Sequence, residues 1–387
     1  MISRVADHCF WLGRYLERAE STARILVVTL TLALDGELSQ RQCWLPVVVV
    51  AGEAPAFTAR FGDEAFDDGE RVQSYMTWDA ENFSSLQSSI AFARENARSV
   101  REVVSLEVWE TLNELHLWFA SEEARDLYER ERFFFYRRVR RELQLATGFV
   151  HSTMLHDGGL DFIRMGRLLE GVSQTARTLD VHHHAMTTAL GLQGPAPAAA
   201  AAESVGAIPV AQSQSQSQSQ SQSQSQSQTS VPPSDVDRRR RHPVVATALW
   251  LSLLKSLSAF EPFMKRAQGQ VTGRAVCEFL MFAEQFPRSL RYGVRHARAR
   301  LAAVRAHDPS VARDASLPGG ASQARLEALD TWLASAAKAH LGAAEQVDPH
   351  EALTHVVDET AAICELLGRE LLGVSPPPRP SDRPAAQ

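Results

Sequence analysis

Residues 11–26 read WLGRYLERAESTARIL, and their apolar and small side chains recur at alternating spacings of four and three residues. Such spacing places these side chains on one stripe of an α-helix, which is typical of the seam of an antiparallel helical bundle. The stripe consists of Leu12, Leu16, Ala19, Ala23, Leu26 and Leu30. The sequence therefore predicts a long amphipathic helix in this part of the chain.

A second copy of this pattern lies 153 residues further along the chain, because Gly13 is matched by Gly166. The copies share GRYLE at 13–17 with GRLLE at 166–170, and both continue with Thr-Ala-Arg. Each copy has an apolar stripe that needs an apolar partner, and equivalent elements of duplicated halves often pair about a symmetry axis. We therefore expect the two helices to pack closely against each other.

Another repeated segment supports two homologous halves. AENF at 80–83 is matched by AEQF at 283–286, and the offset has grown from 153 to 203 residues. This increase is close to the length of a low-complexity segment that interrupts the second copy. The sequence predicts a duplicated helical bundle with a pseudo-twofold axis. The expected halves are residues 1–150, and residues 151–190 together with 243–373.

The low-complexity segment covers residues 191–242. It combines Ala- and Pro-rich sequence with a strict Ser-Gln alternation from 212 to 228. Such a composition buries too little apolar surface to offset the entropy lost on ordering, so the segment is predicted to be a disordered insertion. The Pro-rich tail, residues 374–387, is predicted to be disordered for the same reason.

The rest of the chain is predicted to be all-α. Residues 100–119 and 121–147 are expected to form helices, with Ser121 as an N-cap. A last helix is expected to begin at Asp348 and Pro349 and to end at Gly373. The apolar residues 47–50 could form a short strand, but Trp44 and its surroundings favour a buried helix.

Composition excludes several classes of protein. The net charge of −6 and the pI of about 6.1 argue against a dedicated nucleic-acid-binding protein. No apolar stretch is long enough to span a bilayer, and the opening residues do not resemble a secretory signal. The four cysteines are scattered without a Cys-x-x-Cys pair. We therefore expect a cytoplasmic protein with reduced cysteines, no membrane association and no nucleic-acid partner.

Three segments resemble motifs of the alpha-E family, a bacterial domain of unknown function. The first is the N-terminal segment 3–24, the second is 93–102 with the Trp109-Glu110 pair that follows it, and the third is Phe-Pro-Arg-Ser at 286–289. The sequence departs from the family at Gly171-Val172-Ser173, where Arg-Ala-Asp or Arg-Ala-Glu is usual. The resemblance implies genomic association with circularly permuted ATP-grasp ligases and transglutaminase-like proteins. It thus implies a role in making or processing peptides or amide bonds.

The repeated charged residues are the main candidates for a site. Glu17 and Glu170 are the candidate catalytic carboxylates. The candidate binding residues around them are Arg14, Glu20, Arg24, Arg167 and Arg177. A carboxylate held by guanidiniums could bind an amine or carboxylate of a substrate, or act as a general base if its pKa is raised. Alternatively, these residues form an ion-pair network that fixes helix packing.

A second candidate is the basic face formed by Arg94, Arg98 and Arg101, with Glu102 beside it. Arginine binds phosphates and carboxylates bidentately, so this face could bind an anion, or it could simply be exposed to solvent. Arg288, in the third family motif, completes the set of candidate binding residues. No Glu-x-x-His motif and no Gly-rich phosphate loop occurs, so we expect neither a metal nor a cofactor.

Three functional hypotheses follow. The protein is a helical accessory or partner protein of an ATP-grasp-type ligase, an enzyme that uses Glu17 or Glu170 in amide chemistry, or a structural scaffold. An open cleft lined by Glu17, Arg24, Arg94 and Arg101 would favour binding or catalysis. A dry, closed interface would favour the scaffold.

Overall fold

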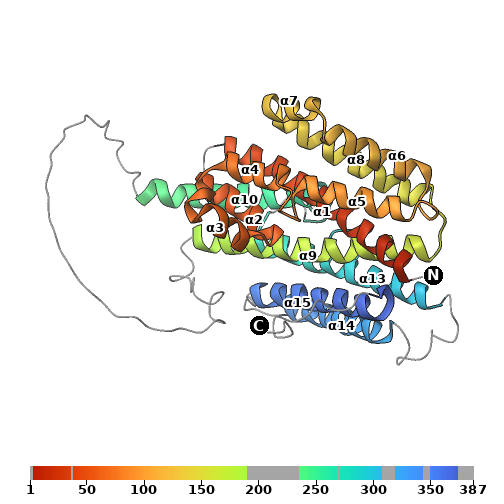
Figure 1. Ribbon diagram of the computed structural model, residues 1–387. Coiled ribbons are helices and arrows are strands. Elements are labelled where there is room, and N and C mark those ends of the chain that lie inside the picture. The colour runs from red at the N-terminus through yellow and green to blue at the C-terminus, as the bar shows by residue number, and fades with distance from the viewer. Residues whose placement is uncertain are drawn as a thin grey trace, which may run out of the picture.

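The computed structural model describes residues 3–35, 38–189, 235–267, 271–306, 319–342 and 349–373. All regular structure within these ranges is helical, which confirms the predicted all-α class (Figure 1). The predicted disordered tail, 374–387, and residues 191–234 of the predicted insertion lie outside the described ranges. The last eight residues of that insertion, 235–242, belong instead to helix α10 (Asp235–Ser256).

Two 32-residue helices, α1 (Ser3–Leu34) and α9 (Gly158–Ala189), form the centre of the molecule. Each packs more extensively against the other than against any other helix, as the matching stripes predict. The stripe of α1 is buried from Leu12 to Leu26. Where the helices cross, a Cβ on Gly13 would lie 2.0 Å from the carbonyl oxygen of Ile163, and a Cβ on Gly166 would lie 2.1 Å from that of Phe10. Only glycine permits this approach, and the two contacts are reciprocal.

Further helices cover this central pair on both sides (Figure 1). On the α1 side lie α5 (Leu86–Ser99), α6 (Leu106–Phe119), α7 (Glu122–Arg130) and α8 (Arg132–Ser152). On the α9 side lie α13 (Leu290–Ala306), α14 (Gly320–Gly342) and α15 (Pro349–Leu367). A π-helical turn, η2 (Gly368–Leu372), continues α15 and contacts α1. The central helix pair therefore buries side chains on both of its sides.

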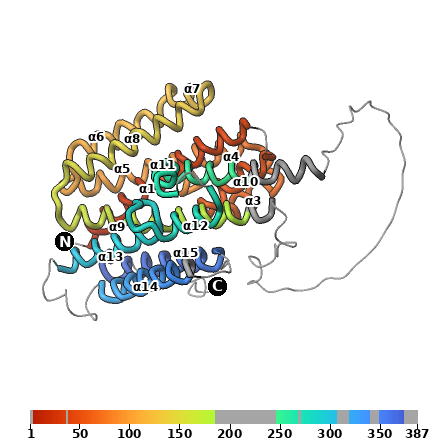
Figure 2. The backbone as a smooth tube through the Cα atoms, turned by 180° about the vertical axis from the view of Figure 1, so that it is seen from behind, coloured from red at the N-terminus to blue at the C-terminus, as the bar shows by residue number. Residues whose placement is uncertain are grey.

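Two further groups of helices pack on the central pair. The first group is α2 (Gln40–Ala51), α3 (Ala54–Phe61), the 3-10 helix η1 (Asp63–Asp67) and α4 (Gly69–Trp78). The second is α10, α11 (Phe260–Ala267) and α12 (Gly273–Phe282), of which α11 and α12 are seen from behind in Figure 2. Trp44 packs on Gly69, and Trp250 packs on Gly273. Each group thus contains a tryptophan side chain that packs against a glycine. The buried helix expected around Trp44 is confirmed.

Two predicted helices have different boundaries in the structure. The chain turns at residues 100–105, and α6 begins after the N-cap Ser105, so Arg101 and Glu102 are not helical. The predicted helix 121–147 is two helices that break at Glu131, although Ser121 does cap the first of them. The predicted end at Gly373 is confirmed, since this residue has a left-handed φ of 70°. None of the described helices has both the length and the apolar character needed to cross a bilayer.

Candidate functional site

Glu17 lies where α1, α9 and the loop before α13 meet. Its carboxylate accepts a hydrogen bond from Arg167 of α9 at 2.8 Å and another from Arg288 of the loop. Ser21, one turn along α1, donates a third hydrogen bond at 3.2 Å. Both carboxylate oxygens therefore have partners, and the negative charge is shared by two guanidiniums from distant parts of the chain.

Glu20 extends this network into the interior. It pairs with Arg24 at 2.7 Å and with Arg288 at 3.1 Å, and Gln144 donates to it at 3.2 Å. Arg24 is fully buried, and it also donates to the carbonyl oxygen of Ser256 in α10 at 2.7 Å. A buried guanidinium is tolerated only with such partners, so this part of the site fixes how α10 packs on α1.

Glu170 is the counterpart of Glu17 on α9. It accepts hydrogen bonds from Arg14 and Arg18 of α1, each at 2.8 Å. Arg14 of α1 thus binds Glu170 of α9, and the matching Arg167 of α9 binds Glu17 of α1. The two helices are therefore joined by two equivalent ion pairs. Arg177, the counterpart of Arg24, approaches Gly52 after α2 and forms no ion pair within the described part of the chain.

The pKa values of two carboxyl groups argue against a general base. Burial alone would raise the pKa of Glu170, but Arg14 and Arg18 outweigh burial and hold the pKa well below its usual range. Burial would also raise the pKa of Glu20, whereas Arg288, Arg24 and Arg167 lower it to about 2. A general base near neutral pH needs a raised pKa, so Glu170 does not meet this condition for the proposed amide chemistry.

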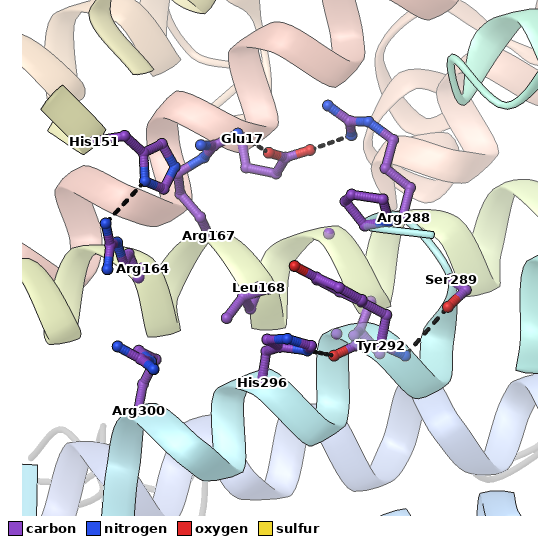
Figure 3. A pocket seen from close by; sticks show the side chains of 14 residues that line it. Glu17, His151, Arg164, Arg167, Leu168, Arg288, Ser289, Tyr292, His296 and Arg300 are labelled. Carbon is purple, nitrogen blue, oxygen red and sulfur yellow. Dashed lines mark hydrogen bonds and ion pairs between the residues drawn. The ribbon is translucent and has the colours of Figure 1, made fainter. Parts of the chain in front are cut away.

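A cavity of about 410 Å³ opens beside Glu17, between α1, α9 and α13 (Figure 3). Its size falls within the usual range for small-molecule sites. The charged and polar lining consists of Glu17, His151, Arg164, Arg167, Arg288, Ser289, Tyr292, His296 and Arg300. Leu168, Gly171, Val172, Pro287 and Gly293 provide the remaining surface. The rings of Tyr292 and His296 stack at 3.7 Å along one wall.

One end of the cavity is formed by side chains from three helices. Arg164 of α9 hydrogen-bonds Nδ1 of His151 at 3.1 Å, and Arg300 of α13 pairs with Asp161 at 3.0 Å (Figure 3). Burial and the neighbouring Arg300 lower the pKa of Arg164, and Asp161 opposes them. Burial, Arg167 and Arg164 lower the pKa of His151, so its ring is neutral at pH 7.

The predicted basic face does not join this site. Arg98 is exposed and pairs with Glu95, while Arg94 and Arg101 lie over the ring of Trp109 at 5.4 and 4.8 Å. Glu102 is exposed in the turn beside them. Of the four residues whose shared cleft would favour binding or catalysis, only Glu17 lines the cavity, because Arg24 is buried in the core and Arg94 and Arg101 lie elsewhere.

The sequence prediction missed several residues of the cavity. They are His151, Arg164, Tyr292, His296 and Arg300. Arg164 lies in the second copy of the repeat, one turn before Arg167, and could have been included on that basis. The others reach the cavity from α8 and α13, which no local pattern connects with α1. Within the described ranges, no group of three or more His, Cys, Asp or Glu side chains could hold a metal ion.

Comparison with known proteins agrees with the motifs. A family model described as "Alpha-E: A predicted alpha-helical domain with a conserved ER motif" matches residues 1–372. A Glu-Arg pair of this kind occurs at Glu17-Arg18, within the network described above.

The curated relatives include an uncharacterised protein of Mycobacterium bovis and another of Mycobacterium tuberculosis. Each is 26% identical over 183 residues, which cover 43% of this chain and 21% of the relative. The chain thus matches about a fifth of the length of these relatives. No solved structure matches. Because the family model covers nearly the whole chain, this protein belongs to the Alpha-E family.

Proposed function

We propose that this protein is a helical accessory protein of a cytoplasmic ATP-grasp-type ligase system, in which it binds a small acidic molecule. The observation that carries the proposal is the cavity beside Glu17, whose wall contains four guanidiniums. Arginine forms planar, charge-assisted hydrogen bonds with carboxylates and phosphates, so this lining suits an acidic ligand. A purely structural protein does not need an open cavity beside its interhelical ion pairs.

The ligase half of the proposal comes from the family resemblance, which implies ATP-grasp and transglutaminase-like neighbours. An accessory role fits the chemistry of the site better than catalysis does. Glu17 already accepts three hydrogen bonds, and Glu170 stays ionised between two arginines. These carboxylates position guanidiniums, and the guanidiniums are the groups left to contact a ligand.

The binding half is tested by isothermal titration calorimetry with citrate, succinate, glutamate and acetate. Arg288→Gln should weaken the binding of the acid that binds best by about tenfold, the loss expected for one charge-assisted hydrogen bond. Arg295→Gln is the matched control, because Arg295 lies on α13 outside the cavity and pairs with Glu284 at 2.9 Å. Circular dichroism checks that both variants are folded.

The ligase half is tested by co-purification with the ligase encoded beside the protein, followed by assays of ligase activity with and without it. We expect a complex whose activity falls when Arg288→Gln replaces the wild-type protein. The proposal fails if no acid binds and the ligase behaves identically in its absence, and the scaffold hypothesis would then stand.

A further inference from the structure

We propose that the cavity holds the doubly charged phosphoryl group of a small molecule at the end formed by Arg164 and Arg300. This inference rests on the proposed ligand-binding function and adds the chemical class of the ligand. It follows from the balance of charge, from unpaired donors, and from a comparison with matching positions elsewhere in the fold.

Positive charge exceeds negative charge around the cavity. Five guanidiniums lie at the cavity or directly behind it. Arg164, Arg167, Arg288 and Arg300 line it, and Arg24 is buried behind them, where it pairs with Glu20. Three carboxylates face them, those of Glu17, Glu20 and Asp161. No other carboxylate in the described part of the chain forms an ion pair with these guanidiniums, and the neutral His151 adds no charge. Two positive charges are left over, which a single dianion would neutralise.

One of the two excess charges lies at Arg164. Arg164 forms no ion pair with a carboxylate of the described residues, although Arg300 beside it is close enough to lower its pKa. The Nε atoms of Arg164 and Arg167 are both buried and have no hydrogen-bond acceptor. Buried donors without acceptors are costly, and so are neighbouring like charges. An anion between these side chains would relieve both costs.

Matching positions in the first half have lost this arrangement. The offset of 153 residues pairs Arg164 with Trp11 and Leu168 with Tyr15, and the N-caps Ser85 and Ser289 set an offset of 204 between α5 and α13. At these offsets His296 is matched by Phe92, and Arg300 by Asn96. Trp11, Tyr15 and Phe92 stack with ring centroids 5.5 and 5.1 Å apart and occupy the equivalent place.

The same comparison covers the charged pair at the end of the cavity. Arg300 pairs with Asp161 at 3.0 Å, and the matching residues Asn96 and His8 form a hydrogen bond at 2.9 Å. One backbone arrangement is thus compatible with a filled, weakly charged core. The helix packing therefore does not require the open, positively charged cavity beside α9. A cavity that packing does not require indicates a ligand-binding site.

The geometry favours a compact dianion over a monocarboxylate. Arg164 and Arg300 lie at the same end of the cavity and share Asp161, which leaves one excess charge there (Figure 3). The other excess charge belongs to Arg24, Arg167 and Arg288, which share Glu17 and Glu20. Arg164 and Arg167 are one turn apart on α9, so a dianion beside both meets both excess charges. A phosphoryl group carries close to two negative charges at neutral pH and has three acceptor oxygens, whereas a carboxylate carries one charge. The stacked Tyr292 and His296 rings and the apolar Leu168 line the rest of the cavity, where the uncharged part of the ligand would lie.

The test compares methyl phosphate with methyl sulfate at pH 8 by isothermal titration calorimetry. The two probes have nearly the same shape, but methyl phosphate carries one more negative charge above its second pKa of about 6. We expect methyl phosphate to bind at least about tenfold more tightly, and Arg164→Gln to remove most of that preference. Lowering the pH to about 5 protonates methyl phosphate and should bring its affinity towards that of methyl sulfate.

Controls keep the result interpretable. Arg298→Gln should leave binding unchanged, because Arg298 lies on α13 and pairs with Asp330 at 2.8 Å outside the cavity. If Arg164→Gln does not fold, Arg164→Lys keeps the charge, loses the planar fork, and should still weaken methyl phosphate binding.

Equal affinity for the two probes, or full affinity in the Arg164 variants, would overturn the phosphoryl assignment. If methyl phosphate fails to bind while an organic acid still binds in an Arg288-dependent manner, only this inference is wrong. If nothing binds, the proposed function fails with it.

Discussion

At the scale of single residues, Glu170 holds α1 and α9 together through two guanidiniums. It is buried, and Arg14 and Arg18 both donate to it. Removing its charge leaves two partly buried arginines without a counter-ion, which is more costly than losing a surface pair. The same reasoning applies to Glu17, which Arg167 and Arg288 share.

We expect Glu170→Gln to lower the free energy of unfolding by about 2–4 kcal/mol. Glu17→Gln should have a similar effect. Glu327→Gln is the control and should change little, because the Glu327 side chain is exposed on α14 and accepts a hydrogen bond from Gln323. Urea denaturation followed by circular dichroism measures all three variants. If the buried and surface variants are equally stable, the network contributes nothing to the fold.

Glu20 makes stability depend on pH in a defined window. Its pKa is about 2 in the folded protein and 4.5 in an ordinary setting, so unfolding takes up a proton when the pH lies between these values. The stabilisation is fully present above the ordinary pKa and is lost as pH falls towards the folded pKa. We expect Glu20 to account for about 3 kcal/mol of the loss between about pH 5 and pH 2. Urea titrations across this window should show a flatter profile for Glu20→Gln than for the wild type.

At the scale of helices, the crossing of α1 and α9 depends on glycine. Gly13→Ala would place a methyl group 2.0 Å from the carbonyl oxygen of Ile163, so the helices must separate. We expect a loss of about 2–3 kcal/mol of stability, in the upper part of the range for overpacked interiors. Gly148→Ala in α8 is the matched control, since a Cβ there meets nothing within 4 Å, and it should stabilise by about 0.5–1 kcal/mol. Thermal unfolding distinguishes the two, and equal effects would show that the crossing tolerates a side chain.

The sequence predicts the helices better than their boundaries. The stripe of α1 and its pairing with α9 follow from residue periodicity, because burial of an apolar stripe needs no detailed geometry. The break between α7 and α8 at Glu131 is not predictable in this way, since neither glycine nor proline occurs there. Instead, the ring of Phe135 packs against those of Trp78, Phe119 and Tyr128, so tertiary packing of aromatic rings directs the chain.

At the scale of the whole molecule, the central helix pair organises the fold of the described residues. We expect a chain in which a short Gly/Ser linker replaces residues 191–234 to keep its melting temperature within a few degrees. The composition of this segment motivates the prediction. Residues 235–242 are retained, because they belong to α10. Differential scanning calorimetry checks the result, and a large decrease would mean that the segment packs on the bundle.

The candidate site is only partly predictable from the sequence, because it depends on how distant helices are arranged in the whole molecule. Glu17, Glu20 and Arg167 belong to a repeat that is visible in the sequence, so their proximity could be expected. Arg300 lies 136 residues after Arg164 on another helix, and only the three-dimensional arrangement brings them to one cavity. Sequence periodicity indicates which face of a helix is buried. It does not indicate which charged residues of different helices contact each other.

The hydrogen bond from Arg24 to Ser256 has a consequence for how the chain acquires its structure. These residues are 232 positions apart, and Arg24 is fully buried in the finished protein. Proteins are synthesised from the N-terminus, so α1 emerges long before Ser256 and Arg288 exist to complete its surroundings. α5 and α8 can already cover part of α1, but the surroundings of Arg24 and Glu20 are completed only by these later segments. Contacts between such distant segments slow folding, so we expect the Arg24 side of α1 to reach its final burial late.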